Sequence, residues 1–300
     1  MSIAKKTLQD LTIRDNFLFA AVMQQGDNCK KFLEMLLKLK INRIDILYEK
    51  TIIYNPEYKG IRLDVYAKGD DHICYNIEMQ VLSGKLPKRS RYYHSQMDME
   101  LLSSGESYNK LSDTYVIFIC DFDPFGLKRY CYSFENRCLE DNTLSLGDGS
   151  KSIFLSTKGN DPSEISPELF RFLTFIRENQ PVDLRDYHDA YVTQLQDTIY
   201  QIKRSKELGS RFMLLEIMLD EKYHEGKAEG IAAGRAEGIA EGRIKSILEL
   251  LEDFAPVPAE LTTFISNEKD PATLQSWHKK AAKANSLEEF MESISFSCPK

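Results

Sequence analysis

The sequence predicts an α/β core, with a mixed central sheet flanked by helices, followed by an α-helical C-terminal region. The first observation behind this prediction is the alternation of helical and strand-like segments over the first 140 residues. The second is a pair of neighbouring strand-like segments with acidic residues at matching positions around a polar turn. The third is a glycine repeat that begins near residue 226. We therefore expect a core over residues 1–140, a mixed, mostly helical extension over 141–225, and a glycine-repeat helix with a small helical module over 226–300.

The core is predicted from periodicity, element by element. Apolar residues recur at helical spacing between residues 28 and 40, which predicts an amphipathic helix, and residues 87–104 predict a second helix. Strand segments are rich in β-branched and aromatic residues, and the polar residues 68–72 predict a hairpin turn. The run 114–120 is apolar throughout, as in a strand covered on both faces. The predicted strands are residues 44–54, 61–67, 73–81, 114–120 and 128–134.

Composition excludes several classes of protein. With 300 residues and 42% hydrophobic content, the chain can bury a sizeable core. The first ten residues lack the apolar segment of a secretory signal, and no later stretch approaches 18 uninterrupted apolar residues. We therefore expect a cytoplasmic protein without a membrane partner. The six cysteines contain no Cys-x-x-Cys pair, which favours buried thiols over a zinc site or a disulfide framework.

The charge distribution leaves room for a nucleic-acid partner despite a formal net charge of −7. Contact with phosphates requires clustered Lys and Arg rather than a positive total. Lys85, Lys88, Arg89 and Arg91 form such a cluster, while the acidic excess lies largely beyond residue 135. A local positive face could therefore hold a phosphate backbone.

The candidate site lies on the predicted hairpin. Because side chains alternate along a strand, each of its two strands should have an apolar face and a polar face. A turn centred near Asp71 would place Asp64 almost directly across from Glu78, with Cβ atoms about 5 Å apart. The expected apolar faces carry Ile61, Leu63 and Val65 in the first strand and Ile77, Met79 and Val81 in the second; the polar faces carry Arg62, Asp64 and Tyr66, and Asn76, Glu78 and Gln80.

Two facing carboxylates indicate a divalent cation. Like charges opposite each other destabilise a sheet by up to about 1 kcal/mol unless something neutralises them. Mg²⁺ prefers one or two protein carboxylates together with waters and phosphate oxygens, and it would activate water and polarise a phosphate for hydrolysis. The alternative from spacing alone is a solvated hairpin face that carries ordinary surface acids.

The same residues resemble a known family. The segments Gly60 to Tyr66 and Tyr75 to Gln80 are similar to the Asp and Glu-x-Gln motifs of the Rpn group of recombination-promoting nucleases and transposases, which are PD-(D/E)XK proteins. Further similarity covers Leu86 to Tyr93, Tyr115 to Cys120, Asp123 to Gly126 and Tyr132 to Cys138, so that it spans residues 10–140. The resemblance implies a restriction-endonuclease-like fold and metal-dependent cleavage of phosphodiester bonds in DNA.

Carried over to this sequence, the resemblance implies that Asp64 and Glu78 bind Mg²⁺ or Mn²⁺ and that Gln80 is the third catalytic residue. Gln80 stands where the wider superfamily usually has lysine, and a neutral amide can only orient water or phosphate by hydrogen bonds. Glu34, on the first predicted helix, is a candidate for the additional acid that many superfamily members place there. Its alternative is an ordinary solvated side chain.

Arg91 and Tyr93 are candidates for substrate binding at the start of the helix that follows the hairpin. A guanidinium there could clamp a phosphate, and the phenol could hydrogen-bond the same backbone. The alternative is a surface arginine and a core tyrosine. Asp121 and Asp123 are left out of the site, because Asp123-Pro-Phe-Gly126 is typical of a turn.

The glycine repeat has its own interpretation. Glycines at 226, 230, 234, 238 and 242 recur at nearly one helical turn. Each glycine costs a helix about 1 kcal/mol relative to alanine, so the segment predicts a marginal helix unless the smooth stripe packs against another helix. The two interpretations are a homo-oligomerisation element and a charged spacer. Short helices are expected at 248–254 and within 271–294.

Three functions follow from these observations. The first is a Mg²⁺-dependent DNA endonuclease, linked to recombination, mobile elements or phage defence. Its sequence specificity is expected to be low, because no separate sequence-reading domain is recognised. The second is a catalytically weak scaffold of the same fold that binds DNA or protein. The third is a helical interaction protein in which residues 206–300 carry the activity alone.

Overall fold

The computed structural model describes residues 6–52, 59–70, 72–180 and 185–296, apart from the side chains of residues 48 and 49. The chain divides into two compact units, Met1–Glu216 and Ile217–Lys300. Each unit has a hydrophobic core of its own, so each is described by itself.

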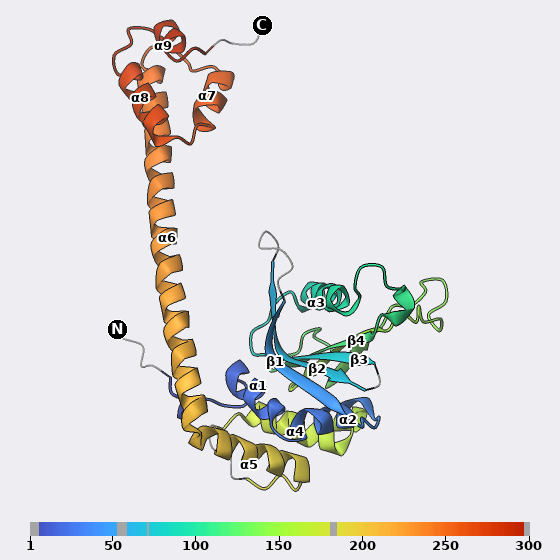
Figure 1. The fold of residues 1–300 in the computed structure, drawn as a ribbon. Coiled ribbons are helices and arrows are strands. Elements are labelled where there is room, and N and C mark those ends of the chain that lie inside the picture. Colours follow the sequence, from blue (N-terminus) through green and yellow to red (C-terminus); the bar gives the residue numbers. More distant parts are fainter. Residues whose placement is uncertain (1–5, 53–58, 71, 181–184, 297–300) are drawn as a thin grey trace. The chain divides into compact units, whose positions relative to one another are not determined.

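Within the described residues, the first unit contains one mixed sheet of six strands in the order β1-β2-β3-β4-β6-β5 (Figure 1). Strands β1, β2 and β3 form an antiparallel meander, β3, β4 and β6 are parallel, and β5 returns antiparallel to β6. This arrangement confirms the α/β prediction. The strands are β1 (Ile44–Ile52), β2 (Ile61–Gly69), β3 (Ile73–Gln80), β4 (Asp113–Cys120), β5 (Cys131–Phe134) and β6 (Ser150–Ser156).

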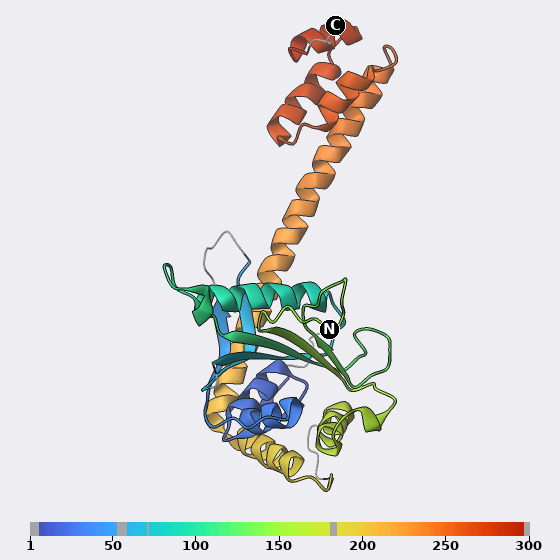
Figure 2. The same cartoon turned by 90° about the vertical axis from the view of Figure 1, so that its right-hand side faces the viewer.

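Helices cover both faces of this sheet (Figure 2). On one face, four helices pack with the odd-numbered residues of β3 into the first core. On the other face, α3 packs with Phe118, Phe154 and their neighbours into the second core. The helices are α1 (Asn16–Gln24), α2 (Asn28–Leu37), α4 (Pro167–Glu178) and α5 (Ala190–Arg204) on the first face and α3 (Leu86–Leu101) on the second.

Most predicted elements are present, with shifted ends. The predicted helix at 28–40 is α2, which ends at Lys38 in the left-handed conformation with φ of 56°. The strand predicted over 44–54 is β1, and residues 53 and 54 lie outside the described residues, as does Asp71 of the predicted turn. Helix α1 and strand β6 were not predicted. Strand β6 and helices α4 and α5 complete and cover the sheet beyond residue 140.

The two hairpin strands alternate differently. In β3 the prediction is confirmed for Ile77 and Met79, which lie in the first core, and for Glu78, which is buried on the face of α3. It is wrong for Val81, which lies just past the strand and is exposed. In β2 the prediction is wrong. Leu63 lies in the second core but Val65 in the first, so the regular alternation of side chains is interrupted at Asp64, where β2 parts from β3. Ile61 and Tyr66 lie with Leu63.

The second unit is a helical module. Helix α6 (Lys206–Glu252) begins in the first unit and runs without a break through the glycine repeat, so the separate short helix expected at 248–254 is instead the end of α6. Its core centres on Trp277, which stacks on Phe264 with 5.2 Å between ring centroids. The remaining helices are α7 (Ala259–Ser266), α8 (Pro271–Ala281) and α9 (Leu287–Ser293).

The glycine stripe of α6 packs against nothing in the described part of the chain. A Cβ atom added at any of the five glycines from Gly226 to Gly242 would meet no atom within 4 Å. The oligomerisation element therefore stays a prediction. Over the described residues, no helix is both long and apolar enough to cross a membrane, and the described cysteines are free thiols.

Candidate active site

Strands β2 and β3 part from each other at the two predicted acids. The β2–β3 pairing in the described residues runs from Lys68↔Cys74 to Val65↔Ile77, and the next residues along the two strands are Asp64 and Glu78. Beyond this point β2 still pairs with β1, while β3 still pairs with β4 as far as Gln80. The sheet therefore forks, and both carboxylates lie in the fork.

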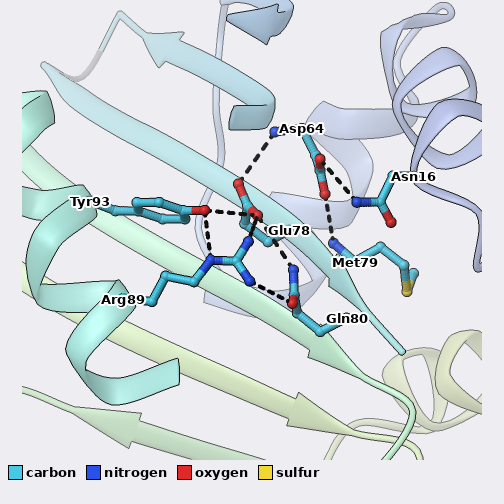
Figure 3. Close-up of polar contacts among 7 residues, drawn as sticks. All are labelled: Asn16, Asp64, Glu78, Met79, Gln80, Arg89 and Tyr93. Atoms are coloured by element: carbon cyan, nitrogen blue, oxygen red, sulfur yellow. Dashed lines mark hydrogen bonds and ion pairs between the residues drawn. The ribbon is translucent and has the colours of Figure 1, made fainter. Parts of the chain in front are cut away.

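Side chains take over the backbone hydrogen bonds in the fork (Figure 3). The backbone N–H of Asp64 donates to Oε1 of Glu78 at 3.3 Å, and the N–H of Met79 donates to Oδ2 of Asp64 at 3.3 Å. The predicted opposition of Asp64 and Glu78 is thus confirmed as geometry. Each carboxylate is held by the strand that carries the other.

Burial makes the charged forms of both acids unfavourable. Glu78 is only 1% exposed, and its burial, together with the nearby charge of Asp64, raises its pKa to about 8. Burial likewise raises the pKa of Asp64 to about 6, although hydrogen bonds from Met79 and Asn16 act in the opposite direction. Near neutral pH, the pair of acids therefore tends to keep a proton as long as no metal ion is bound.

Gln80 lies beside Glu78 on the same face of β3. Its side chain is buried, and Nε2 donates to Oε2 of Glu78 at 3.4 Å. The amide oxygen faces α3 and accepts a hydrogen bond from Arg89 Nη1 at 2.8 Å. Gln80 is therefore a neutral link between the acid and the helix.

Helix α3 contributes Arg89 and Tyr93 to the site. Arg89 Nη2 lies 2.8 Å from Oε2 of Glu78, and Nε donates to the phenol of Tyr93 at 2.7 Å. The phenol in turn donates to Oε2 of Glu78 over a long 3.5 Å. Burial raises the pKa of Tyr93 to about 12, so its hydroxyl stays protonated. Arg91 is exposed, and two residues along a helix from Arg89 it does not share a face with Arg89 and Tyr93.

The predicted additional acid does not join the cluster. Glu34 Oε1 accepts a hydrogen bond from the backbone N–H of Ile41 at 3.0 Å, which ties α2 to the segment before β1. On the face opposite α3, the residue that reaches Asp64 is Asn16, the first residue of α1. Its Nδ2 donates to Oδ1 of Asp64 at 3.3 Å.

Sequence reasoning did not assign Asn16 or Arg89 to the site. For Arg89 a signal was available, because Arg89 and Tyr93 are four residues apart and so share one face of a helix. For Asn16 none was, since its contact with Asp64 depends on where an unpredicted helix packs.

The donor set suits a hard divalent cation. Asp64 and Glu78 offer carboxylate oxygens, and in the described chain no three His, Cys, Asp or Glu residues gather closely enough to form a fuller cage. A cation here would need water and phosphate oxygens to complete its coordination, which is how Mg²⁺ is usually bound. A bound cation would reduce the repulsion between the two buried carboxylates.

The lysines Lys85 and Lys88 extend this site outward. Both are exposed at the N-terminal end of α3, next to Arg89. Together with Arg89 they make this end of the helix positively charged.

Comparison with known proteins places this region in a family. Residues 16–158 match the family described as PD-(D/E)XK nuclease family transposase. The match covers the sheet up to β6, and it agrees with the family that the hairpin motifs indicated. Neither the curated proteins nor the solved structures yielded a match.

Proposed function

We propose that this chain, whose residues 16–158 belong to the PD-(D/E)XK nuclease family of transposases, is a metal-dependent endonuclease that hydrolyses phosphodiester bonds in DNA. The observation that carries the proposal is the position of Asp64 and Glu78 on opposite sides of the fork between β2 and β3. Nucleases of this class generally use divalent metals. Mg²⁺ or Mn²⁺ held by the two acids would supply Lewis-acid activation of the phosphate and of the attacking water.

The protein's own groups have separate roles in this proposal. Asp64 and Glu78 hold the cation, and Asn16 and the N–H of Met79 fix the carboxylate of Asp64. Gln80 orients the groups around Glu78 through its amide. Because these contacts are already made in the free protein, the acids need little rearrangement when the substrate binds.

Low sequence specificity is part of the proposal. Lys85 and Lys88 would contact phosphates, which are the same in every sequence. A nuclease that cuts with little sequence preference would suit recombination, mobile-element biology or phage defence.

The test is cleavage of supercoiled plasmid with Mg²⁺, Mn²⁺ or EDTA. We expect metal-dependent nicking that falls by about 100-fold or more in Asp64→Ala and in Glu78→Ala. Glu34→Gln is the matched control, because Glu34 is an acid of the same unit that contacts Ile41 instead of the fork. Equal activity in the two site variants would rule out these residues as the site. Failure of folded native protein to cleave would favour a catalytically weak scaffold that binds DNA or protein.

A further inference from the structure

The fork holds two carboxylates and an amide, and Arg89 contacts one of the carboxylates, Glu78, and the amide of Gln80. Hydrolysis of a phosphodiester develops negative charge on the phosphoryl oxygens, and neither a carboxylate nor the amide of Gln80 can neutralise that charge. Arg89 reaches both Glu78 and Gln80 with Nη2 and Nη1, each at 2.8 Å. It therefore stands where the reaction needs positive charge.

The guanidinium is held in place on its other side. Its central carbon lies 5.2 Å from the ring centroid of Tyr93 and 5.8 Å from that of Phe118, and Nε donates to the Tyr93 hydroxyl. Stacking on aromatic rings fixes the plane of the guanidinium group. Three hydrogen bonds and two rings thus orient one side chain, as expected of a preorganised site.

Exposure distinguishes Arg89 from a purely structural partner of Glu78. The arginine side chain is 40% exposed, whereas the Glu78 side chain is 1% exposed. One end of the ion pair therefore faces solvent, from which a substrate must arrive. A guanidinium in this position can form a bidentate contact with a phosphate once it is released from the carboxylate.

We propose that Arg89 binds the reacting phosphate, and that Arg89 and the divalent cation compete for Oε2 of Glu78. Without the metal, Arg89 occupies this oxygen. The proposal rests on the proposed nuclease function and adds the residue that recognises the substrate phosphate. A cation that binds Glu78 weakens the hold of the carboxylate on Nη2. The freed Nη2 then donates to a phosphate oxygen, while Nη1 stays on Gln80 and Nε on Tyr93.

The contact with Arg89 explains why the side chain at position 80 is neutral. Its Oε1 accepts from Arg89, so a lysine at position 80 would place an ammonium group against the guanidinium. Gln80→Lys should therefore impair the native protein. In the absence of Arg89, the same lysine would supply the missing charge from the neighbouring strand.

The experiment compares Arg89→Ala, Gln80→Lys and the double variant in plasmid cleavage and in Mn²⁺ binding by calorimetry without DNA. Arg43→Ala is the control, since Arg43 is an exposed arginine of the same unit that pairs with Asp45 away from the fork. We expect cleavage to fall by about 100-fold in Arg89→Ala, with Arg43→Ala close to native. In the double variant we expect a recovery of about tenfold over Arg89→Ala.

Arg89→Ala should lower cleavage but raise the affinity for Mn²⁺. Arg89→Ala should bind Mn²⁺ about tenfold more tightly than the native protein, the factor expected when one charge-assisted hydrogen bond no longer competes. Weaker or unchanged Mn²⁺ binding would contradict the competition, and native-like cleavage by Arg89→Ala would contradict the phosphate contact. If Arg89→Ala does not fold, Arg89→Gln keeps a donor toward Glu78 and serves in its place.

The two proposals fail in different ways. A native protein that cleaves nothing, under any metal, contradicts the nuclease, yet the Mn²⁺ comparison still decides whether Arg89 competes for Glu78. A native protein that cleaves, loses activity in Asp64→Ala and keeps it in Arg89→Ala contradicts only the role of Arg89.

Discussion

Arg14 and Asp121 form an ion pair one residue beyond the end of β4, with 2.5 Å between Nη1 and Oδ2. The arginine also donates to the backbone carbonyl of Ile176 at the end of α4. On the other side, the backbone N–H of Asp121 donates to the carbonyl of Gln80 at 2.9 Å. The pair therefore connects the N-terminal segment and α4 to the strand end that carries the candidate site.

Replacement of Arg14 should destabilise the first unit. Both side chains of the pair are largely buried, at 17% and 13% exposure, so Arg14→Met leaves the carboxylate with only Lys158 and Thr157 as side-chain partners. We expect a loss of about 3 kcal/mol in the free energy of unfolding, measured with urea and circular dichroism. The control is Arg43→Met, which breaks an exposed pair with Asp45 and should cost less than about 1 kcal/mol.

Glu78→Gln should stabilise the metal-free protein at pH 8 and not at pH 4. The folded-state pKa of Glu78 is about 8, against an ordinary value of 4.5. Between these values the unfolded chain releases a proton that the folded chain keeps, so the stability of the native protein falls as pH rises through this window. In EDTA we expect the variant to gain on the order of 3 kcal/mol at pH 8. A variant that is less stable than native at pH 8 would contradict the burial of an unfavourable charge.

Stabilisation by metal should grow with pH. The cation and the proton compete for the carboxylates, and the pKa of Glu78 at about 8 means that the proton is held more firmly at pH 6 than at pH 8.5. Added Mn²⁺ should raise the melting temperature more at pH 8.5 than at pH 6, as measured by scanning calorimetry. Glu78→Gln removes the titrating group and should abolish most of the shift. An equal shift in this variant would place the bound metal elsewhere.

The burial of neutral His94 should make the first unit less stable in mild acid. His94 is 8% exposed, and burial lowers its pKa to about 4 from an ordinary 6.5, so the folded protein keeps it neutral between Thr114 and Ser152. As pH falls from 6.5 to 4, the unfolded chain takes up a proton that the folded chain refuses. This difference removes about 3 kcal/mol of stability.

The check is the slope of the unfolding free energy against pH in that window. His94→Gln should flatten the slope, whereas His224→Gln, at a histidine that is 68% exposed, should leave it unchanged. The same slope in His94→Gln as in the native protein would show that other groups cause it.

The hairpin was predictable because its information is local. The turn centre sets the register, and the register brings Asp64 next to Glu78, which the structure confirms. The faces of β2 were not predictable from alternation alone. Val65 changes side relative to Leu63 at the point where β2 parts from β3, and that point is set by the rest of the sheet.

Two elements left no periodic signal. In α1 every residue from Leu18 to Met23 is buried, so its apolar positions show no helical stripe. Strand β6 begins with Ser150-Lys-Ser152, which lacks the apolar character of a central strand. The contact from Asn16 to Asp64 follows from the packing of α1 and was hidden for the same reason.

Trp277 lies in the core of the unit Ile217–Lys300 and stacks on Phe264, and it is the single tryptophan of the sequence. Excitation at the red edge of the protein absorption therefore selects this unit alone and leaves the nuclease core optically silent. A change in tryptophan emission as DNA or metal is added would report communication from the fork to the far end of α6. Constant emission would show that the C-terminal unit does not sense the chemistry of the core.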